Sequence, residues 1–218
     1  MASAVYLQLR EDILRGGLRP GEKLRADYLR KRYEVGTSPL REALNRLSAD
    51  GLVERKDQRG FSVSTVSAAH LLELVKTRCW LEALALRESI RNRSPEWEES
   101  VVLAFHRLSR VPRSTTPETY NRNPEWEDLH RKFHMAIISA SGSQLLLGFC
   151  AQLNDQADRY RNLAAVASFP QRNELEEHRA IQRAAINGET EEAAALLEAH
   201  FVRTAEIIRS SLREFTDS

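Results

Sequence analysis

The sequence predicts a mainly α-helical protein in two parts, a winged helix-turn-helix over residues 1–66 and an all-α helical bundle over residues 67–218. Three observations carry this prediction. An amphipathic helix with start signals begins near Ser38-Pro39, two short strand patterns follow it, and only helical periodicity appears beyond residue 67. With 218 residues, the chain is long enough for two small domains, each with its own core.

The first elements are two helices that precede a turn. A helix from about residue 4 to residue 15 places Leu9 and Ile13 on one face and stops at a Gly-Gly pair. A shorter helix over residues 27–33 is followed by a turn at 34–36, which contains the glycine that such turns often have. We expect both helices to support the helix after the turn.

The helix that begins at Ser38-Pro39 has one face that is free for binding. Serine is a favoured N-cap, and proline is tolerated at the first helical position because its missing N–H would have no partner there. The apolar stripe at i, i+3, i+4 and i+7 consists of Leu40, Ala43, Leu44 and Leu47. This stripe is expected to pack inward, which leaves Arg41, Asn45 and Arg46 on the other side.

A hairpin and a local excess of positive charge complete this part of the chain. Strand patterns at 52–55 and 61–64 flank a tip at 57–60, which predicts a wing. Residues 1–66 contain thirteen Lys and Arg against nine Asp and Glu, a net charge of +4, whereas the whole chain carries +1. A basic front and an acidic remainder are typical of a protein whose front contacts phosphates, with ordinary scatter of charges as the alternative.

Three segments of this part together carry a resemblance. They are Thr37-Ser38-Pro39-Leu40-Arg41-Glu42-Ala43-Leu44, Asp50-Gly51-Leu52-Val53 and Arg59-Gly60-Phe61-Ser62-Val63. The stretch from residue 4 to 66 resembles the DNA-binding domain of the GntR family of bacterial transcription regulators. The resemblance implies a homodimer on double-stranded DNA with an inverted-repeat operator. The side chains expected at the DNA are Arg25, Lys31, Arg32, Thr37, Ser38, Arg41, Asn45, Arg46 and Arg59.

One position in the motif departs from the family pattern. The family often has an arginine between the turn and the cap, where this chain has Thr37. In the family that arginine often contacts bases, so we expect a different operator sequence. Arg41 and Arg46 are expected to contact bases or backbone, whereas most of the other side chains contact phosphates, which position the protein without specifying sequence.

Helical patterns separated by turn residues fill the rest of the chain. Ser67 can cap a helix over 68–91, and Ser94-Pro95 opens another that ends near residue 110. A loop is expected between residues 111 and 123, and further helices at 124–140, 143–165, 171–187 and 189–214. This pattern predicts the bundle.

The cysteines and the overall hydropathy indicate a soluble chain. Cys79 and Cys150 are far apart in sequence and are expected to be reduced core residues. No signal peptide and no apolar run of membrane-spanning length appears, so we expect a cytoplasmic protein without membrane contact.

Four of the six histidines fall on inward faces of the predicted helices. His130 and His134 are one turn apart, His178 shares a face with Ile181, and His200 follows Leu196 by four positions. A lone inward histidine is usually a satisfied core residue, but four from three helices are hard to bury without partners. Because neutral imidazole is the commonest protein metal ligand, we predict a divalent metal at His130, His134, His178 and His200. Separately satisfied core histidines are the alternative.

The same histidines carry a second resemblance. The segments are His130-Arg131-Lys132-Phe133-His134, Glu177-His178-Arg179-Ala180-Ile181 and Gly188-Glu189, with His200 further on. They resemble the helical, FCD-type ligand-binding domain of the FadR subfamily, in its shorter VanR-like branch. Many members hold a divalent metal through one aspartate and three histidines, and the metal helps to hold a small organic acid.

The resemblance assigns the metal ligands residue by residue. The three histidines are His134, His178 and His200, and His130 occupies the aspartate position. An all-nitrogen set favours zinc, with nickel or copper as alternatives, because imidazole is softer than carboxylate. Glu127, on the same helix face, is a further candidate that would supply a carboxylate.

Arg78 is the candidate for binding the effector. It lies on the apolar stripe of helix 68–91, where a permanent cation needs an anion. In the resembled family an arginine ahead of Leu81-Glu82 can hold the effector's carboxylate. An intrahelical ion pair with Glu82 at i+4 is the alternative, and both interpretations stay open. Arg159, Tyr160 and Arg161 are additional candidates for the pocket.

The sequence therefore predicts a DNA-binding transcriptional repressor whose operator affinity falls when a small carboxylate binds at the metal site. The effector is expected to shift helix 68–91, which is joined directly to the wing, with a coupling of about 1–3 kcal/mol. One alternative is a metal-dependent hydrolase or other metalloenzyme in which the histidine site activates water. Another is a regulator with a metal-free pocket for a longer apolar ligand.

Overall fold

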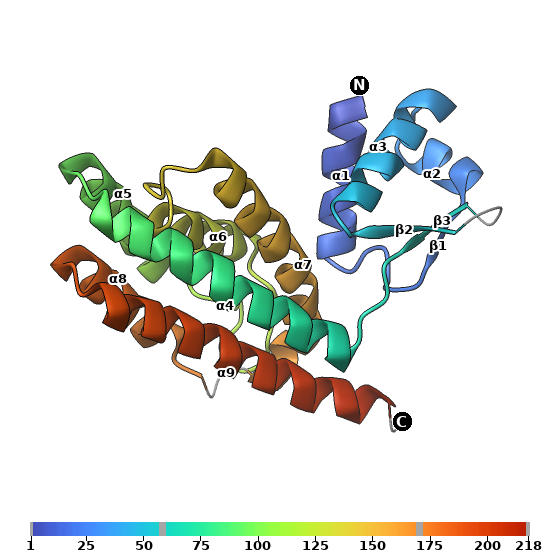
Figure 1. The fold of residues 1–218 in the computed structure, drawn as a ribbon. Helices are drawn as coiled ribbons and strands as arrows, with labels where there is room; N and C mark the ends of the chain where they lie inside the picture. Colours follow the sequence, from blue (N-terminus) through green and yellow to red (C-terminus); the bar gives the residue numbers. More distant parts are fainter. Residues whose placement is uncertain (1, 57–59, 169–171, 217–218) are drawn as a thin grey trace.

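The computed structural model describes residues 2–56, 60–168 and 172–216. The N-terminal part contains three helices and a small sheet, and the remainder is helical (Figure 1). The N-terminal elements are α1 (Ala2–Leu14), β1 (Lys23–Leu24), α2 (Ala26–Arg32), α3 (Thr37–Ala49), β2 (Val53–Lys56) and β3 (Gly60–Val63). The later elements are α4 (Ala68–Arg91), α5 (Pro95–Ser109), α6 (Pro124–Ile137), α7 (Gln144–Ser168), α8 (Glu174–Asn187) and α9 (Thr190–Thr216).

The N-terminal sheet has three antiparallel strands in the order β1-β3-β2. Val53 pairs with Val63 across the predicted hairpin, and Lys23 pairs with Ser62 on the other side of β3. The strand patterns at 52–55 and 61–64 therefore predicted the hairpin to within a residue, but β1 was missed. A strand of two residues is too short to show the alternation by which strands are recognised.

The start of α3 differs from the prediction. Gly36 has extended backbone angles (φ −74°, ψ 169°) and is the N-cap, and its carbonyl accepts a hydrogen bond from the Leu40 N–H at 3.3 Å. Ser38 is therefore the second residue of the helix and does not cap it. The first turn leaves its N–H groups without helical partners in any case, so Pro39 is tolerated at the third position as well as at the first.

The predicted apolar stripe of α3 packs as expected. Leu40, Ala43, Leu44 and Leu47 are all buried, together with Leu9 and Ile13 of α1 and Leu29 of α2. Val53 of β2 and Val63 of β3 pack against these residues and complete the core. The N-terminal part thus has a hydrophobic core of its own, which holds α3 with its polar side outward.

The bundle is organised around α4. In Figure 1 α4 and α9 run side by side, and α7 runs along the other side of α4 toward the N-terminal part. Ser67 caps α4 as predicted, accepting a hydrogen bond from the His70 N–H at 3.1 Å. The core of the bundle includes Leu86, Phe133 and Phe201, each with at most 2% of its surface exposed.

The remaining sequence predictions on the bundle hold with shifted ends. α6 ends at Ile137 rather than at residue 140, and α8 begins at Glu174 rather than at residue 171. The cysteines are free thiols, Cys150 buried and Cys79 half-buried, and burial raises the pKa of Cys150 to about 12. Among the helices of the described ranges, none is both long and apolar enough to cross a bilayer.

Candidate functional site

The four predicted histidines converge in the bundle. His130 and His134 come from α6, His178 from α8 and His200 from α9, and each has at most 5% of its surface exposed. The Nε2 atom of His134 lies 3.1 Å from that of His130 and 3.2 Å from that of His178. One possible ligand atom from each of the four side chains lies within 4.8 Å of the other three. Three helices separated in sequence therefore bring four imidazoles to one point.

This arrangement fits a metal ion. With metal–nitrogen bonds of about 2.0–2.1 Å, neighbouring nitrogens of a four- to six-coordinate shell are roughly 2.9–3.4 Å apart, which the separations of 3.1 Å and 3.2 Å match. Among the residues that the structure describes, the buried Nδ1 atoms of His130 and His134 have no hydrogen-bond partner. Burial lowers the pKa of all four imidazoles, that of His200 to about 4, so they are neutral near pH 7 and able to donate a lone pair.

His200 is oriented by a neighbouring carboxylate. Its Nδ1 atom lies 2.8 Å from Oε2 of Glu177, which also accepts a hydrogen bond from Nη2 of Arg172 at 2.6 Å. Burial alone would raise the pKa of Glu177, but the hydrogen bonds from His200 and Arg172 outweigh it and hold that pKa well below its usual range. The carboxylate fixes the ring so that Nε2 is the nitrogen available to a ligand or metal.

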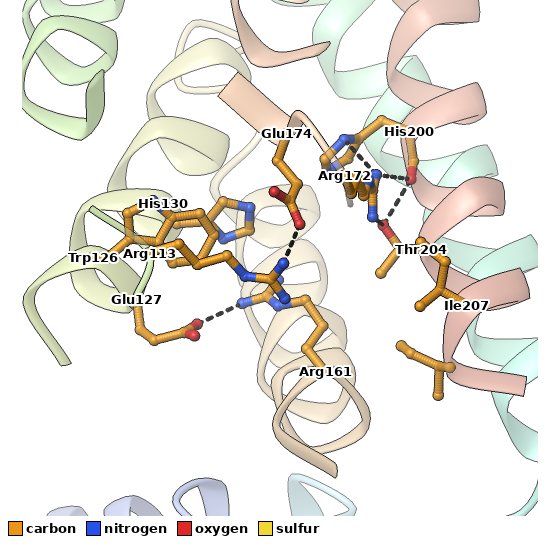
Figure 2. A pocket seen from close by; sticks show the side chains of 11 residues that line it. Arg113, Trp126, Glu127, His130, Arg161, Arg172, Glu174, His200, Thr204 and Ile207 are labelled. Atoms are coloured by element: carbon orange, nitrogen blue, oxygen red, sulfur yellow. Dashed lines mark hydrogen bonds and ion pairs between the residues drawn. The ribbon is translucent and has the colours of Figure 1, made fainter. Parts of the chain in front are cut away.

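A small cavity opens beside the histidines (Figure 2). Its volume is about 30 Å³, and it is lined by Arg113, Trp126, Glu127, His130, Arg161, Arg172, Glu174, His200, Thr204, Ile207 and Ile208. We call it the inner cavity. Three of its side chains are guanidinium groups, two are carboxylates and two are imidazoles of the histidine cluster. Because the guanidinium groups outnumber the carboxylates, the cavity suits an anion that also reaches the cluster.

Glu127 faces a cation rather than the histidines. Its Oε2 atom lies 3.4 Å from Nη2 of Arg161, which also pairs with Asp158 at 2.6 Å. Among the described residues, the group with metal-ligand spacing contains the four histidines and not Glu127. Glu127 therefore pairs with Arg161, whereas its place on the helix face had made it a candidate metal ligand beside the histidines.

Arg78 adopts the ion-pair arrangement that was its alternative interpretation. Its Nε atom lies 2.6 Å from Oε1 of Glu82, both side chains are at most 5% exposed, and its guanidinium stacks on the Phe201 ring at 4.0 Å. Arg78 is not among the described residues that line the inner cavity. Of the three additional candidates, only Arg161 lines the cavity, because Arg159 and Tyr160 face the N-terminal part.

Sequence reasoning missed the two other arginines of the cavity. Arg113 lies in the loop after α5, and Arg172 lies just before α8. Loop residues follow no helical or strand period, so nothing in the local pattern says where their side chains point. The only signal in the sequence was the placement of Arg172 a few residues before the Glu177-His178 pair.

A second candidate site is the outer face of the N-terminal part. Thr37, Ser38, Arg41 and Asn45 of α3 are exposed, as are Arg25 and Lys31 beside and on α2. Two other predicted DNA contacts have partners within the domain. Arg32 donates to Asp12 at 2.7 Å, and the guanidinium of Arg46 lies 4.3 Å from the centre of the Tyr6 ring. Arg59 lies outside the described residues.

Comparison with known proteins assigns both parts of the chain to known families. Residues 1–63 match the family described as bacterial regulatory proteins, gntR family, and residues 73–203 match the FCD domain. The chain belongs to the GntR family. It is a DNA-binding transcriptional regulator with an N-terminal winged helix-turn-helix and a C-terminal helical FCD domain, as the sequence predicted.

Relatives of this GntR regulator are similar over almost their whole length. The HTH-type transcriptional regulator BphR of Paraburkholderia xenovorans (strain LB400) is 38% identical over 96% of this chain and 85% of its own. The HTH-type transcriptional repressor GlaR of Escherichia coli (strain K12) is 33% identical over 95% of each chain. E. coli McbR/YncC shares the fold with a TM-score of 0.79 and 20% identity, over 96% of this chain and 97% of its own.

These comparisons decide between the functional classes. Both matched families and the named relatives are transcription regulators rather than enzymes, so the metalloenzyme alternative is set aside. The FCD match is consistent with a metal in the histidine cluster, but it does not identify that metal.

In this GntR regulator α7 connects the two sites. The side-chain amide of Gln156 donates to the backbone carbonyl of Asp50, the C-cap of α3, at 3.2 Å. Asn162 donates to the Leu14 carbonyl at the end of α1, and its neighbour Arg161 lines the inner cavity. The sequence indicated only the covalent route through α4, whereas α7 touches the recognition helix directly.

Proposed function

We propose that this regulator is a homodimeric repressor whose operator binding is released by a small carboxylate bound at a divalent metal, zinc foremost, in the FCD domain. The observation that supports it most is the histidine cluster opening into an arginine-lined cavity. The cluster offers four neutral nitrogens, and the cavity offers positive charge beside them. That combination suits a ligand with a carboxylate group better than it suits an apolar ligand.

The proposed mechanism assigns separate tasks to the chain's own residues. His130, His134, His178 and His200 hold the metal, which when bound supplies an electrophilic centre to a carboxylate oxygen. Arg161, with the other guanidiniums of the cavity, orients and neutralises the ligand. Arg161 lies on α7 and is already paired with Glu127 and Asp158, so a new anion there changes the balance of charges that holds α7.

The change is transmitted through α7 to α3. Gln156 and Asn162 hold α7 against Asp50 and Leu14, so a small shift of α7 moves the recognition helix relative to the bundle. In a dimer on an inverted repeat, the two recognition helices lie about one helical turn, roughly 34–36 Å, apart, and a changed spacing weakens binding. A coupling of about 1–3 kcal/mol is typical for such linkage.

The homodimer is supported by an apolar surface on the bundle. The exposed fractions of Trp80 and Leu72 on α4 and of Val202 on α9 are 63%, 50% and 45%. Leu72, Trp80 and Val202 line one shallow groove between these helices. Contiguous exposed apolar surface of this kind is typical of protein interfaces.

The proposal is tested first by metal content and chelation. Untagged protein should contain a divalent metal, and EDTA should lower its melting temperature. A metal at about 1,000 times its Kd stabilises the native state by about 4 kcal/mol, which at roughly 2–4 °C per kcal/mol predicts a shift of about 8–16 °C. His134→Ala should abolish the effect of EDTA. His106→Ala, on the exposed side of α5, is the matched control and should leave it unchanged.

The DNA half of the proposal has its own test. Selection from a random duplex library should return an inverted repeat, and fluorescence anisotropy should show that Arg41→Ala weakens binding to it. Small carboxylates that raise the melting temperature should lower operator affinity. A metal-free protein whose melting temperature ignores EDTA would refute the metal site, and carboxylates that strengthen operator binding would refute repression relieved by ligand.

A further inference from the structure

The inner cavity adjoins a larger cleft, and a small set of residues lines both. A second, outer cleft of about 390 Å³ lies between the loop after α5 and the start of α8. Four side chains line both the cleft and the inner cavity, namely Arg113, Trp126, Arg172 and Glu174. They therefore form a wall between the cleft and the inner cavity, and Figure 2 shows them around the cavity. His178 of the histidine cluster lines the cleft itself.

The inner cavity must widen for an organic ligand in the cleft to pass His178 and reach His130 and His200. A volume of about 30 Å³ holds roughly two water molecules. Even acetate, with four non-hydrogen atoms, is larger than that. The outer cleft, by contrast, is more than ten times as large and accommodates a small organic acid without rearrangement.

Two of the four wall residues are fixed by their other contacts. The Trp126 ring stacks on His130 with centroids 4.7 Å apart and an interplanar angle of 16°. Arg172 donates to Glu177 and, at 2.8 Å, to the hydroxyl of Thr204, and it also contacts the backbone carbonyl of His200. Moving either residue would disturb the histidine cluster itself.

The other two wall residues form an ion pair with each other. Arg113 lies in the loop after α5, and Glu174 is the first residue of α8, so the pair joins a loop to the start of a helix. Nη1 of Arg113 donates to Oε1 of Glu174, and the two side chains are only 16% and 13% exposed. Burial raises the pKa of Glu174, which shows that its charge is poorly solvated and depends on a cation.

We propose that the Arg113–Glu174 ion pair is the gate of the inner cavity, and that the carboxylate group of an entering ligand takes the place of Glu174 on Arg113. The proposal rests on the proposed function, because it takes the cavity to be the effector site. The exchange replaces one carboxylate by another, so Arg113 keeps an anionic partner throughout. No buried guanidinium is left without an anion, and the side chain of Glu174 swings into the water of the outer cleft.

The gate makes Glu174 a competitor of the ligand. Because the ligand carboxylate takes the same side of the Arg113 guanidinium that Glu174 occupies, the native ion pair competes with it and weakens the observed affinity. Glu174→Gln keeps the size of the side chain and removes its charge. Because charge-assisted hydrogen bonds contribute roughly 10-fold to 100-fold to an equilibrium, this substitution should tighten carboxylate binding by about tenfold or more.

The test is calorimetric titration of the full chain with sodium acetate against a sodium chloride control, in zinc-loaded and in EDTA-treated protein. Glu174→Gln should bind acetate more tightly than the unmodified chain, and Arg113→Gln should bind it more weakly. In the double variant, the second change should have no tightening effect, because the competition requires Arg113. Glu176→Gln is the matched control, since Glu176 lies in the same first turn of α8, is 56% exposed and pairs with the exposed Arg179.

Each outcome decides a separate statement. Acetate binding that Glu174→Gln leaves unchanged or weakens overturns the gate and leaves the carboxylate site intact. Equal tightening by Glu174→Gln and Glu176→Gln also overturns it, because the effect would then come from the charge of the α8 terminus. If acetate binds neither the zinc-loaded nor the EDTA-treated protein, in the unmodified chain and in every variant, the carboxylate site itself is overturned, and the gate with it.

Discussion

Asp155 offers a direct test of how the two domains are held together. It lies on α7, and its side chain is 10% exposed. Oδ2 accepts a hydrogen bond from Nε of Arg10 on α1 at 2.7 Å, and Oδ1 accepts from Arg131 on α6, next to His130. One carboxylate thus joins the DNA-binding domain to the helix that carries two of the histidines. Asp155→Asn would remove its charge with almost no change in size.

The cost of this substitution follows from the contacts. A hydrogen bond to a charged group contributes about 1.5–3 kcal/mol, and an asparagine oxygen can still accept one bond from either arginine. The side chains of Arg10 and Arg131 are 20% and 28% exposed, so water partly solvates whichever is left unpaired. We expect a loss of about 2 kcal/mol in the free energy of unfolding. For a chain of this length that corresponds to a fall of about 4–8 °C in melting temperature.

The assay is differential scanning calorimetry with a matched variant. Asp128→Asn makes the same chemical change in a pair with Lys132, whose two side chains are 57% and 63% exposed. Exposed pairs contribute about 0–1 kcal/mol, so this variant should melt within a few degrees of the unmodified chain. If Asp155→Asn is as harmless as Asp128→Asn, the carboxylate does not hold the domains together and the reasoning fails.

Three further predictions concern stability. In chelated protein, burial lowers the pKa of His200 to about 4. As the pH falls, His200 therefore binds a proton near pH 6.5 in the unfolded chain but only near pH 4 in the native chain. The contribution of His200 to the free energy of unfolding should therefore be constant above pH 6.5 and fall by about 3 kcal/mol as the pH drops to 4. Urea unfolding at each pH measures this, and a free energy of unfolding that does not change with pH would contradict it. Tyr160→Phe removes a hydroxyl that lies 3.2 Å from the Ser67 N–H, at the junction of the domains, and 2.8 Å from Nδ1 of His70, and should cost about 1–3 kcal/mol in the same assay. Gly188→Ala should destabilise the chain, because Gly188 has φ +77° and a Cβ there would lie 1.9 Å from the Arg93 guanidinium. Gly148→Ala is the matched substitution: Gly148 lies in α7 with open space around it, so this change should stabilise the chain by about 0.5–1 kcal/mol.

Much of the bundle was predictable because its helices carry their start signals in the sequence. Ser67, Ser94 and Asn123 each accept a hydrogen bond from the first turn of the helix that follows, and Pro95 and Pro124 stand at the first positions of theirs. Such signals act within four residues, so they do not depend on the rest of the fold. Where two such signals overlap, as at Gly36 and Ser38, the local pattern placed the start of α3 two residues too late.

The inward position of the four histidines was predictable for a related reason. An α-helix turns by a fixed angle per residue, so the sequence decides that His130 and His134 share a face and that this face is apolar. Four inward imidazoles then need a common explanation. The FCD family match, found independently of the geometry, is consistent with a bound metal ion as that explanation.

The arginine-lined side of the cavity could not be predicted in this way. Arg113 and Arg172 come from loops, where no period constrains the direction of a side chain. Arg78 lies on the correct face of α4 but pairs with Glu82, because its nearest anion is one turn away on the same helix. Which guanidinium reaches the cavity depends on how α6, α7 and α8 pack, and that packing involves side chains far apart in sequence.

The sequence by itself determined which residues form helices, which face of each helix is buried, and that a DNA-binding part precedes a histidine-bearing bundle. Only the tertiary structure decided that the four imidazoles meet within 4.8 Å, that Arg113, Arg161 and Arg172 line the cavity beside them, and that α7 reaches the end of the recognition helix. The physical reason is range. Backbone geometry and capping act over one or two turns, whereas the distances between helices are set by the packing of the whole core.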